Sequence, residues 1–125
     1  MFFEIEPKTD PRGSLFPWEL GKFIPKRMFF IKNVPAGMVR GEHAHKETDQ
    51  MLFCISGNIE ITFFDGENET SFFLKEGNYV FEKRMTWTSM KFIEENSILL
   101  VLSTKEYSAD DYIRSKNDYL NLLSA

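Results

Sequence analysis

Short apolar or alternating runs, each closed by turn residues, follow one another along most of this chain. In residues 59–64, Ile59, Ile61 and Phe63 alternate with other residues, as on a strand with one buried face. The Asp65-Gly66 pair that follows is a strong turn signal. The same pattern predicts strands over residues 28–32, 39–45, 51–55, 59–64, 71–74, 79–81, 85–92 and 98–102. This succession is typical of an all-β protein.

The C-terminal tail has a different character. Residues 108–111 (SADD) resemble a helix start with Ser108 as N-cap. Side chains then recur at helical spacing: Tyr112, Tyr119, Leu120 and Leu123. We therefore expect a short C-terminal helix covering one end of a β-barrel or sandwich.

Length and charge limit the possible functions. The 125 residues predict one domain spanning 1–125. A net charge of −4 gives no support to nucleic-acid binding, and no run is long enough to span a bilayer. The single Cys54 excludes an intrachain disulfide, and the N-terminus becomes acidic too soon for a signal peptide. We expect a cytoplasmic protein.

The only two histidines, His43 and His45, lie two residues apart. On a strand they point to the same face, so their imidazoles stand side by side. Imidazole is both a proton carrier near neutral pH and a common metal ligand. A single histidine on a strand is more often a structural hydrogen-bond partner. The pairing and regular spacing of these two favour a functional role.

Glycines frame the histidine pair at a regular spacing. From Gly37 to Gly57 the string is G-x5-H-x-H-x4-Q-x6-G, which resembles the first motif of the cupin superfamily. The resemblance implies a double-stranded β-helix, or jelly-roll barrel. The second cupin motif begins at Gly77 but is degraded, with Thr88 where its histidine is expected.

Cupins that bind metal usually supply three histidines and a glutamate. Here Gln50 and Thr88 replace one carboxylate and one imidazole, and both replacements are poor ligands for first-row metals. We therefore expect no metal and no cofactor, with His43 and His45 acting as acid–base groups in a barrel mouth.

A closer family resemblance extends over residues 10–120. Residues 40–46 (RGEHAHK) resemble the R-G-x-H-A-H-K signature of sugar 3,4-ketoisomerases that act on dTDP-4-keto-6-deoxyglucose. Further matches occur in the same order: RGSL at 12–15, Q-x3-C-x2-G from Gln50, Trp87, Tyr107 and DYIR at 111–114. The resemblance implies a metal-independent isomerase on the route to 3-amino-3,6-dideoxy sugars. It also implies that His43 and His45 are the catalytic pair and that the protein is a homodimer.

The resemblance and the ligand's chemistry suggest binding residues. A diphosphate suits Arg40 or Lys46, although strand alternation puts Arg40 on the face opposite the histidines. Gln50 suits the sugar. Arg12 resembles relatives that form the galacto product, which we therefore favour. Thymine stacking on an aromatic ring completes the set of candidate binding residues, which is Arg12, Phe30, Arg40, Lys46, Gln50, Trp87 and Thr88.

Three other functions compete with this interpretation. A cupin dTDP-sugar epimerase shares the nucleotide and the fold. A non-catalytic cupin would bind a small carbohydrate, and a metal-dependent cupin oxygenase is the third. The apolar start, residues 1–5, suggests an edge strand that pairs either with another subunit or with its own sheet.

Overall fold

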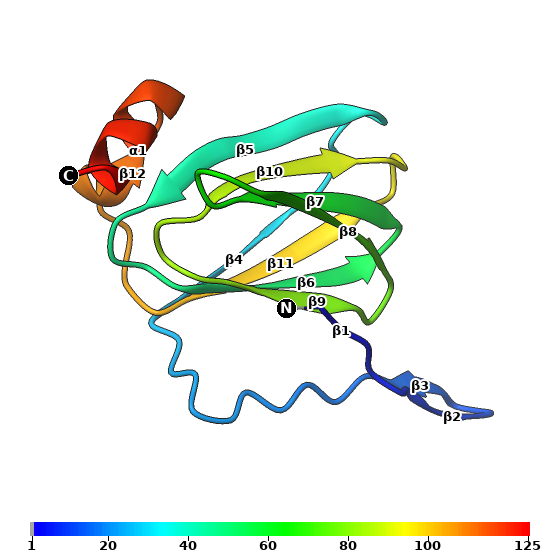
Figure 1. Cartoon of the computed structure of the whole chain (residues 1–125). Helices are drawn as coiled ribbons and strands as arrows, with labels where there is room; N and C mark the ends of the chain where they lie inside the picture. The colour runs from blue at the N-terminus through cyan, green and yellow to red at the C-terminus, as the bar shows by residue number, and fades with distance from the viewer. Residues whose placement is uncertain (1) are drawn as a thin grey trace.

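Two five-stranded antiparallel sheets face each other in the computed structural model, which describes residues 2–125 (Figure 1). The first sheet has the order β1 (Phe2–Phe3), β9 (Tyr79–Glu82), β6 (Gln50–Ser56), β11 (Ile98–Ser103) and β4 (Arg27–Ile31). The second has the order β12 (Tyr112–Ile113), β5 (Met38–His45), β10 (Trp87–Phe92), β7 (Asn58–Phe64) and β8 (Glu69–Lys75). This jelly-roll sandwich confirms the expected all-β cupin architecture.

The core lies between the two sheets. Ile59 and Ile61 of β7 are fully buried while Glu60 and Thr62 are not, as the alternation predicts. From the first sheet Leu52, Val80, Leu99 and Val101 meet them in one cluster. The inward-facing side chains are apolar along most of the interior, so its few polar positions stand out.

The C-terminal segment forms a strand before it forms a helix. Residues Ala109–Asp111 make a single 3-10 turn, and Tyr112 then pairs with His45 in β12. Helix α1 (Lys116–Leu123) begins later, with the Ser115 side chain accepting the Asp118 N–H. Ser108 is thus the N-cap position of the 3-10 turn only, without a side-chain cap hydrogen bond, and the prediction that it starts the C-terminal helix is wrong because pairing with β5 keeps residues 112–113 extended.

Tyr119 fixes the helix to the second sheet. Its ring is fully buried against Ala44 and Trp87, and its hydroxyl reaches the carbonyl oxygens of Phe64 and Met85. The helix therefore covers the outer face of the strands that carry the histidines. No helix within residues 2–125 is long and apolar enough to cross a membrane.

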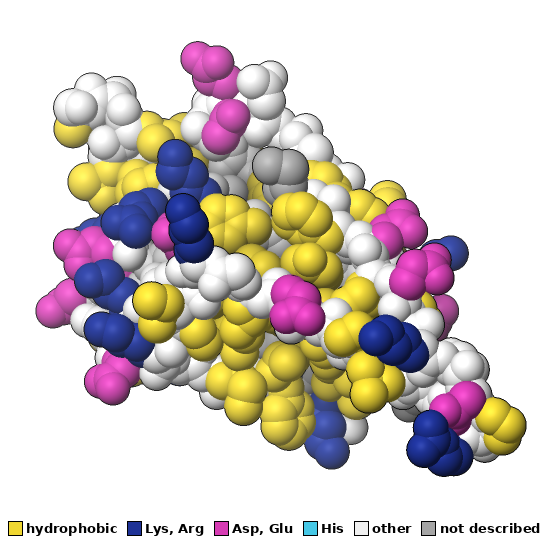
Figure 2. Space-filling model, turned by 90° about the horizontal axis from the view of Figure 1, so that it is seen from below, with side chains coloured by type: hydrophobic (Ala, Val, Ile, Leu, Met, Phe, Trp, Pro, Cys, Tyr) yellow, Lys and Arg dark blue, Asp and Glu magenta, His cyan; other side chains and the backbone are white. Residues whose placement is uncertain are grey.

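The outer face of the first sheet is also apolar. Trp18, Leu20 and Phe23, in the segment between β3 and β4, cover part of it. Ile24, Met28 and Phe30 remain largely exposed at 72%, 69% and 61%. Figure 2 shows hydrophobic side chains gathered on the face seen from below.

The N-terminal run pairs within its own chain. Phe2 and Phe3 lie opposite Val80 and Tyr79 of β9, so in the structure these residues extend their own sheet. Met1, the first residue of that predicted run, lies outside the described residues. The hairpin of β2 (Lys8–Asp10) and β3 (Gly13–Leu15) then projects away from both sheets (Figure 1).

Candidate functional site

A bulge in β5 lies just before the two histidines. His43 is opposite Thr88, but the next residue of β10, Ser89, is opposite Gly41, so Glu42 is an extra residue on β5. Gly41 and Glu42 both have positive φ, and a Cβ on Gly41 would stand 3.0 Å from the Thr88 carbonyl oxygen. The glycine of the RGEHAHK motif is therefore required by the close approach of two strands.

The two imidazoles stand together on the inner face of β5. Their ring centroids are 5.2 Å apart and the rings are nearly perpendicular, at 87°. The Tyr112 ring lies 5.0 Å from His43 and 4.4 Å from His45, centroid to centroid. His45 is only 4% exposed and His43 is half-buried. The alternation that predicted a shared face therefore holds from His43 to His45.

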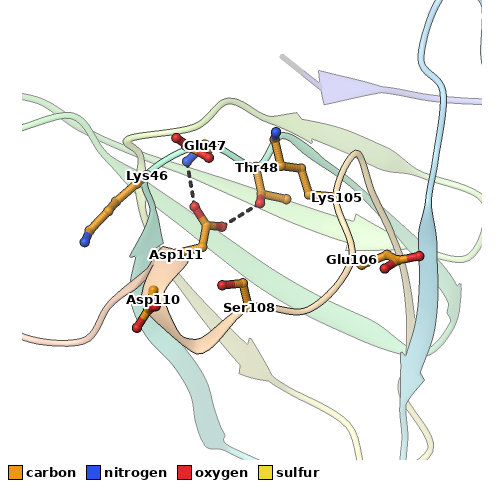
Figure 3. Close-up of a pocket in the computed structure, with 8 residues that line it drawn as sticks. All are labelled: Lys46, Glu47, Thr48, Lys105, Glu106, Ser108, Asp110 and Asp111. Carbon is orange, nitrogen blue, oxygen red and sulfur yellow. Dashed lines mark hydrogen bonds between the residues drawn. The ribbon is translucent and has the colours of Figure 1, made fainter.

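Asp111 holds His45 from the C-terminal segment. Its Oδ2 lies 3.0 Å from His45 Nδ1, and its Oδ1 accepts the Glu47 N–H at 2.7 Å. The Thr48 hydroxyl donates to the same carboxylate, as the dashed lines of Figure 3 show. A carboxylate accepts only, so His45 carries its proton on Nδ1. Its Nε2, buried and without a hydrogen-bond partner among the described residues, is left as an acceptor.

Burial keeps both imidazoles neutral. Desolvation, followed by the neighbouring His45, lowers the pKa of His43 to about 4. Burial also lowers the pKa of His45, although the hydrogen bond and charge of Asp111 oppose this. Burial would raise the pKa of Asp111, but hydrogen bonds from Thr48, Glu47 and His45 outweigh it and hold that pKa below its usual value. At neutral pH the site contains two neutral imidazoles and one carboxylate.

A row of polar side chains crosses the first sheet opposite the histidines. The register places Glu82 beside Gln50, Gln50 beside Ser103 and Ser103 beside Arg27. The Gln50 amide donates to the Ser103 hydroxyl at 2.8 Å. Arg27, Gln50, Ser103, His45 and Tyr112 line one narrow interior space. Gln50 thus lies beside His45, while Arg27, Ser103 and Glu82 had no motif to mark them in the sequence.

Cationic side chains surround Tyr112 at the mouth of this space. Arg27 Nη1 lies 3.4 Å from the Tyr112 hydroxyl, and its guanidinium lies over the Phe29 and Tyr107 rings. The Arg114 guanidinium lies 4.4 Å from the centroid of the Tyr112 ring. Both arginines act to lower the pKa of His45. Asp111, Tyr112 and Arg114 belong to the DYIR match, so the sequence did contain a signal for them.

Two further candidate residues lie close to the pair. Thr88 is fully buried directly opposite His43. Lys46 is exposed and lines a surface hollow with Asp111 and Lys105 (Figure 3).

Arg40 is exposed, and the register pairs it with the buried Met90. We expected Arg40 on the face of β5 that points away from the histidines. The register corrects this expectation, because the extra residue Glu42 interrupts the strand alternation between Arg40 and His43.

The remaining candidates lie apart from the histidine pair within one chain. Phe30 is exposed on the outer side of β4. Trp87 packs on the outer side of β10 against Tyr119, with ring centroids 5.7 Å apart. Arg12 pairs with Asp10 at 2.6 Å in the projecting hairpin. Their roles in binding stay predictions.

The possible metal-ligand side chains at the site do not form a metal-binding group among the residues that the structure describes. Within residues 2–125 no three His, Cys, Asp or Glu side chains are grouped so as to hold a metal ion. His45 is committed to Asp111 through Nδ1. The arrangement can accept, hold and pass protons between two imidazoles, with one of them oriented by a carboxylate.

Known proteins resemble this chain along its whole length. A family model described as FdtA: WxcM-like, C-terminal matches residues 1–124. The TDP-4-oxo-6-deoxy-alpha-D-glucose-3,4-oxoisomerase of Aneurinibacillus thermoaerophilus is 32% identical over 116 residues, which cover 88% of this chain and 82% of that protein.

Solved structures agree with the sequence comparisons. The crystal structure of a 3,4-ketoisomerase from Helicobacter canadensis superposes with a TM-score of 0.92 at 32% identity, covering 100% of this chain and 97% of that one. QdtA, a sugar 3,4-ketoisomerase from Thermoanaerobacterium thermosaccharolyticum in complex with TDP, gives 0.90 at 27% identity, covering 99% and 93%. Two sugar epimerases, at 16% and 14% identity, share the fold alone.

Proposed function

The chain belongs to the FdtA family of WxcM-like C-terminal domains, and from this premise we propose that it is a 3,4-ketoisomerase of dTDP-4-keto-6-deoxyglucose. The 32% identical oxoisomerase and ketoisomerase support this reaction. The epimerases are more distant. The observation that carries the proposal is the neutral histidine pair, with the buried Nε2 of His45 left as an acceptor.

The reaction moves a ketone between two adjacent carbons. The proton on C3 leaves, an enediol forms, and a proton is delivered to C4, so that the C4 ketone becomes a C3 ketone. No redox cofactor is needed, because one carbon is oxidised as its neighbour is reduced. Neutral imidazoles can accept the carbon proton and return it. His43 and His45 are the groups we assign to this task, without a metal.

Asp111 is the positioning residue for His45. It fixes the imidazole tautomer with the proton on Nδ1 and stabilises the imidazolium that forms when Nε2 takes a proton. Thr48 and the Glu47 N–H hold the carboxylate in turn. Burial lowers the pKa of His43 to about 4, so its imidazole is unprotonated at neutral pH and available as a base.

The negatively charged nucleotide end of the substrate suits the cationic side chains around Tyr112. Arg27, Arg114 and Lys46 supply positive charge for a diphosphate, and Arg can bind it bidentately. Gln50 lines the narrow space beside His45, and we assign its amide to the sugar. The galacto product, which Arg12 favours, and a later role in making 3-amino-3,6-dideoxy sugars are part of the same proposal.

We also propose that the chain works as a homodimer of single cupin domains in the cytoplasm. Ile24, Met28 and Phe30 expose apolar surface on and beside the edge strand β4, which an isolated chain would leave in water. Sedimentation equilibrium should give twice the mass of one chain, and Phe30→Ser should shift the protein toward the monomer. A monomeric mass for the wild-type protein would refute the dimer.

Proton NMR in heavy water tests the function. Incubating dTDP-4-keto-6-deoxyglucose with the protein should give a 3-keto sugar nucleotide with deuterium at C4, and the ring couplings identify the epimer. Deuterium exchange without a 3-keto product would indicate an epimerase. An unchanged spectrum would reject both enzymes and favour the carbohydrate-binding protein.

A further inference from the structure

Glu82 is an acidic residue inside the sandwich that no motif marks. It is only 3% exposed on β9, and the register places it opposite Gln50 of β6. Residues directly opposite each other in an antiparallel pair share a face. Gln50 bonds Ser103 on the inner face and lines the space beside His45. Glu82 therefore belongs to the polar layer that faces the histidines.

The Glu82 side chain reaches across the interior to the second sheet. Its carboxyl lies near enough to Thr88 of β10 for that side chain to influence its pKa, and Thr88 lies opposite His43 of β5. Glu82, Thr88 and His43 thus follow one another across the sandwich. The layer of the proposed site contains a carboxyl in addition to two imidazoles and an amide.

No cation compensates Glu82. Among residues 2–125 the ion pairs join Arg12 to Asp10, His45 to Asp111 and Arg84 to Asp49, and none includes Glu82. The charged group that acts on it is Asp49, which precedes β6 and is paired with Arg84. Thr88 of β10 and Gln50 of β6 are uncharged, and His43 of β5 is neutral.

A buried carboxyl in such surroundings holds its proton. Burial raises the pKa of Glu82 to about 7; the nearby Thr88 side chain opposes this rise and the charge of Asp49 supports it. A carboxylic acid kept protonated near neutral pH can donate a hydrogen bond and a proton. Both imidazoles are neutral and one is committed to Asp111, so Glu82 is the carboxyl of this layer that can supply a proton; the Tyr112 phenol is the other O–H group beside the imidazoles.

We propose that Glu82 is a further catalytic residue, the acid that moves the proton between the two sugar oxygens while the imidazoles move the carbon proton. This inference rests on the proposed ketoisomerase function. It places a catalytic acid next to Thr88, the residue that stands where the second cupin motif would have its histidine.

The proton transfers balance. An imidazole takes the C3 proton as the C3–C4 bond gains double-bond character and the C4 oxygen takes the proton of the Glu82 carboxyl. The resulting enediol then collapses: the imidazolium returns a proton to C4, and the O3 proton passes to the Glu82 carboxylate. The sugar has exchanged a C4 ketone for a C3 ketone, and both protein groups regain their starting forms.

Three variants test Glu82. Glu82→Gln keeps the shape and removes the acid, Glu82→Leu makes the position apolar, and Glu69→Gln on the exposed β8 is the matched control. We expect Glu82→Gln to lower kcat by about 10²- to 10⁴-fold with little change in KM. Wild-type kcat should fall as pH rises through about 7, the pKa of Glu82, and this fall should be absent from Glu82→Gln.

Two readouts do not depend on turnover. The infrared carbonyl band of a protonated carboxyl should be present in the wild-type protein and in Glu69→Gln, and absent from Glu82→Gln. Glu82→Leu should raise Tm above pH 7 while remaining inactive, because an uncompensated buried charge is costly there. If Glu82 instead stabilises the fold, Glu82→Leu should lower Tm above pH 7.

Different results would overturn the catalytic role of Glu82 and the proposed ketoisomerase function. If wild-type protein turns over no dTDP-4-keto-6-deoxyglucose, the ketoisomerase proposal and the catalytic role of Glu82 are both overturned. If the wild type turns over and Glu82→Gln keeps its kcat and pH profile, only the role of Glu82 is overturned. A fall in Tm that accompanies the loss of activity in both variants would make Glu82 a structural residue and would also overturn it.

Discussion

His43→Asn and His45→Asn should each lower 3,4-ketoisomerase turnover by at least about 10³-fold, because each removes a group that must accept or deliver a proton in the transition state. The imidazoles are 5.2 Å apart and are the only ones in the chain, so no neighbouring histidine can substitute. The measurement is the amount of 3-keto product formed from dTDP-4-keto-6-deoxyglucose, followed by proton NMR in heavy water.

The same spectra separate the roles of the two histidines. The variant that lacks the base for the C3 proton should lose deuterium exchange together with product. If the other histidine only delivers the proton to C4, its variant should retain slow exchange of the C3 proton. Glu42→Gln, on the exposed residue next to His43, should keep wild-type turnover. Full activity in either histidine variant, with its fold intact by circular dichroism, would eliminate that histidine as a catalytic group.

Asp111→Asn should lower kcat by about 10²- to 10⁴-fold, although Asp111 is assigned only a positioning role. The neutral amide no longer fixes the His45 proton on Nδ1 and does not stabilise the imidazolium; the corresponding Asp→Asn change in a serine protease triad costs about 10⁴-fold. KM should change less, because Asp111 lies behind His45, on its Nδ1 side.

A spectroscopic readout distinguishes positioning from simple stability. The hydrogen bond and charge of Asp111 raise the pKa of His45 against the larger effect of burial, so Asp111→Asn should lower that pKa further. Titration of the His45 ring by NMR measures this shift. The neighbouring exposed Asp110→Asn is the matched control and should leave both kcat and the His45 pKa unchanged. An unshifted His45 pKa in Asp111→Asn would contradict the positioning role.

Stability should also respond to Asp111 at low pH. The folded-state pKa of this carboxyl lies below its unfolded value of 3.8, so its stabilising contribution is present above that value and is lost as pH falls through the folded pKa. His43 acts in the same direction at higher pH. Its pKa of about 4, below the ordinary histidine value of 6.5, makes folding less favourable as pH falls below 6.5. Lowering the pH should therefore destabilise the folded protein through Asp111 and His43, two groups that the proposed reaction uses.

Local patterns were sufficient for most of the strands and for the histidine pair. Alternation places Ile59 and Ile61 in the core, and it holds for His43 and His45 because the backbone between them is regular. It fails at Arg40, where Gly41 and Glu42 adopt positive φ and one extra residue enters β5. Counting along a strand cannot show an inserted residue, because the bulge depends on the partner strand.

The sequence by itself determined the all-β class, the turns, and two imidazoles on one strand face, since each follows from residues within a few positions of one another. Only the tertiary structure decided what stands around those imidazoles. Asp111 reaches His45 from the far end of the chain, and Glu82, Gln50, Ser103 and Arg27 form a row through pairing of four strands. Strand register is set by the packing of whole sheets, so local patterns do not show which residues distant in sequence become neighbours.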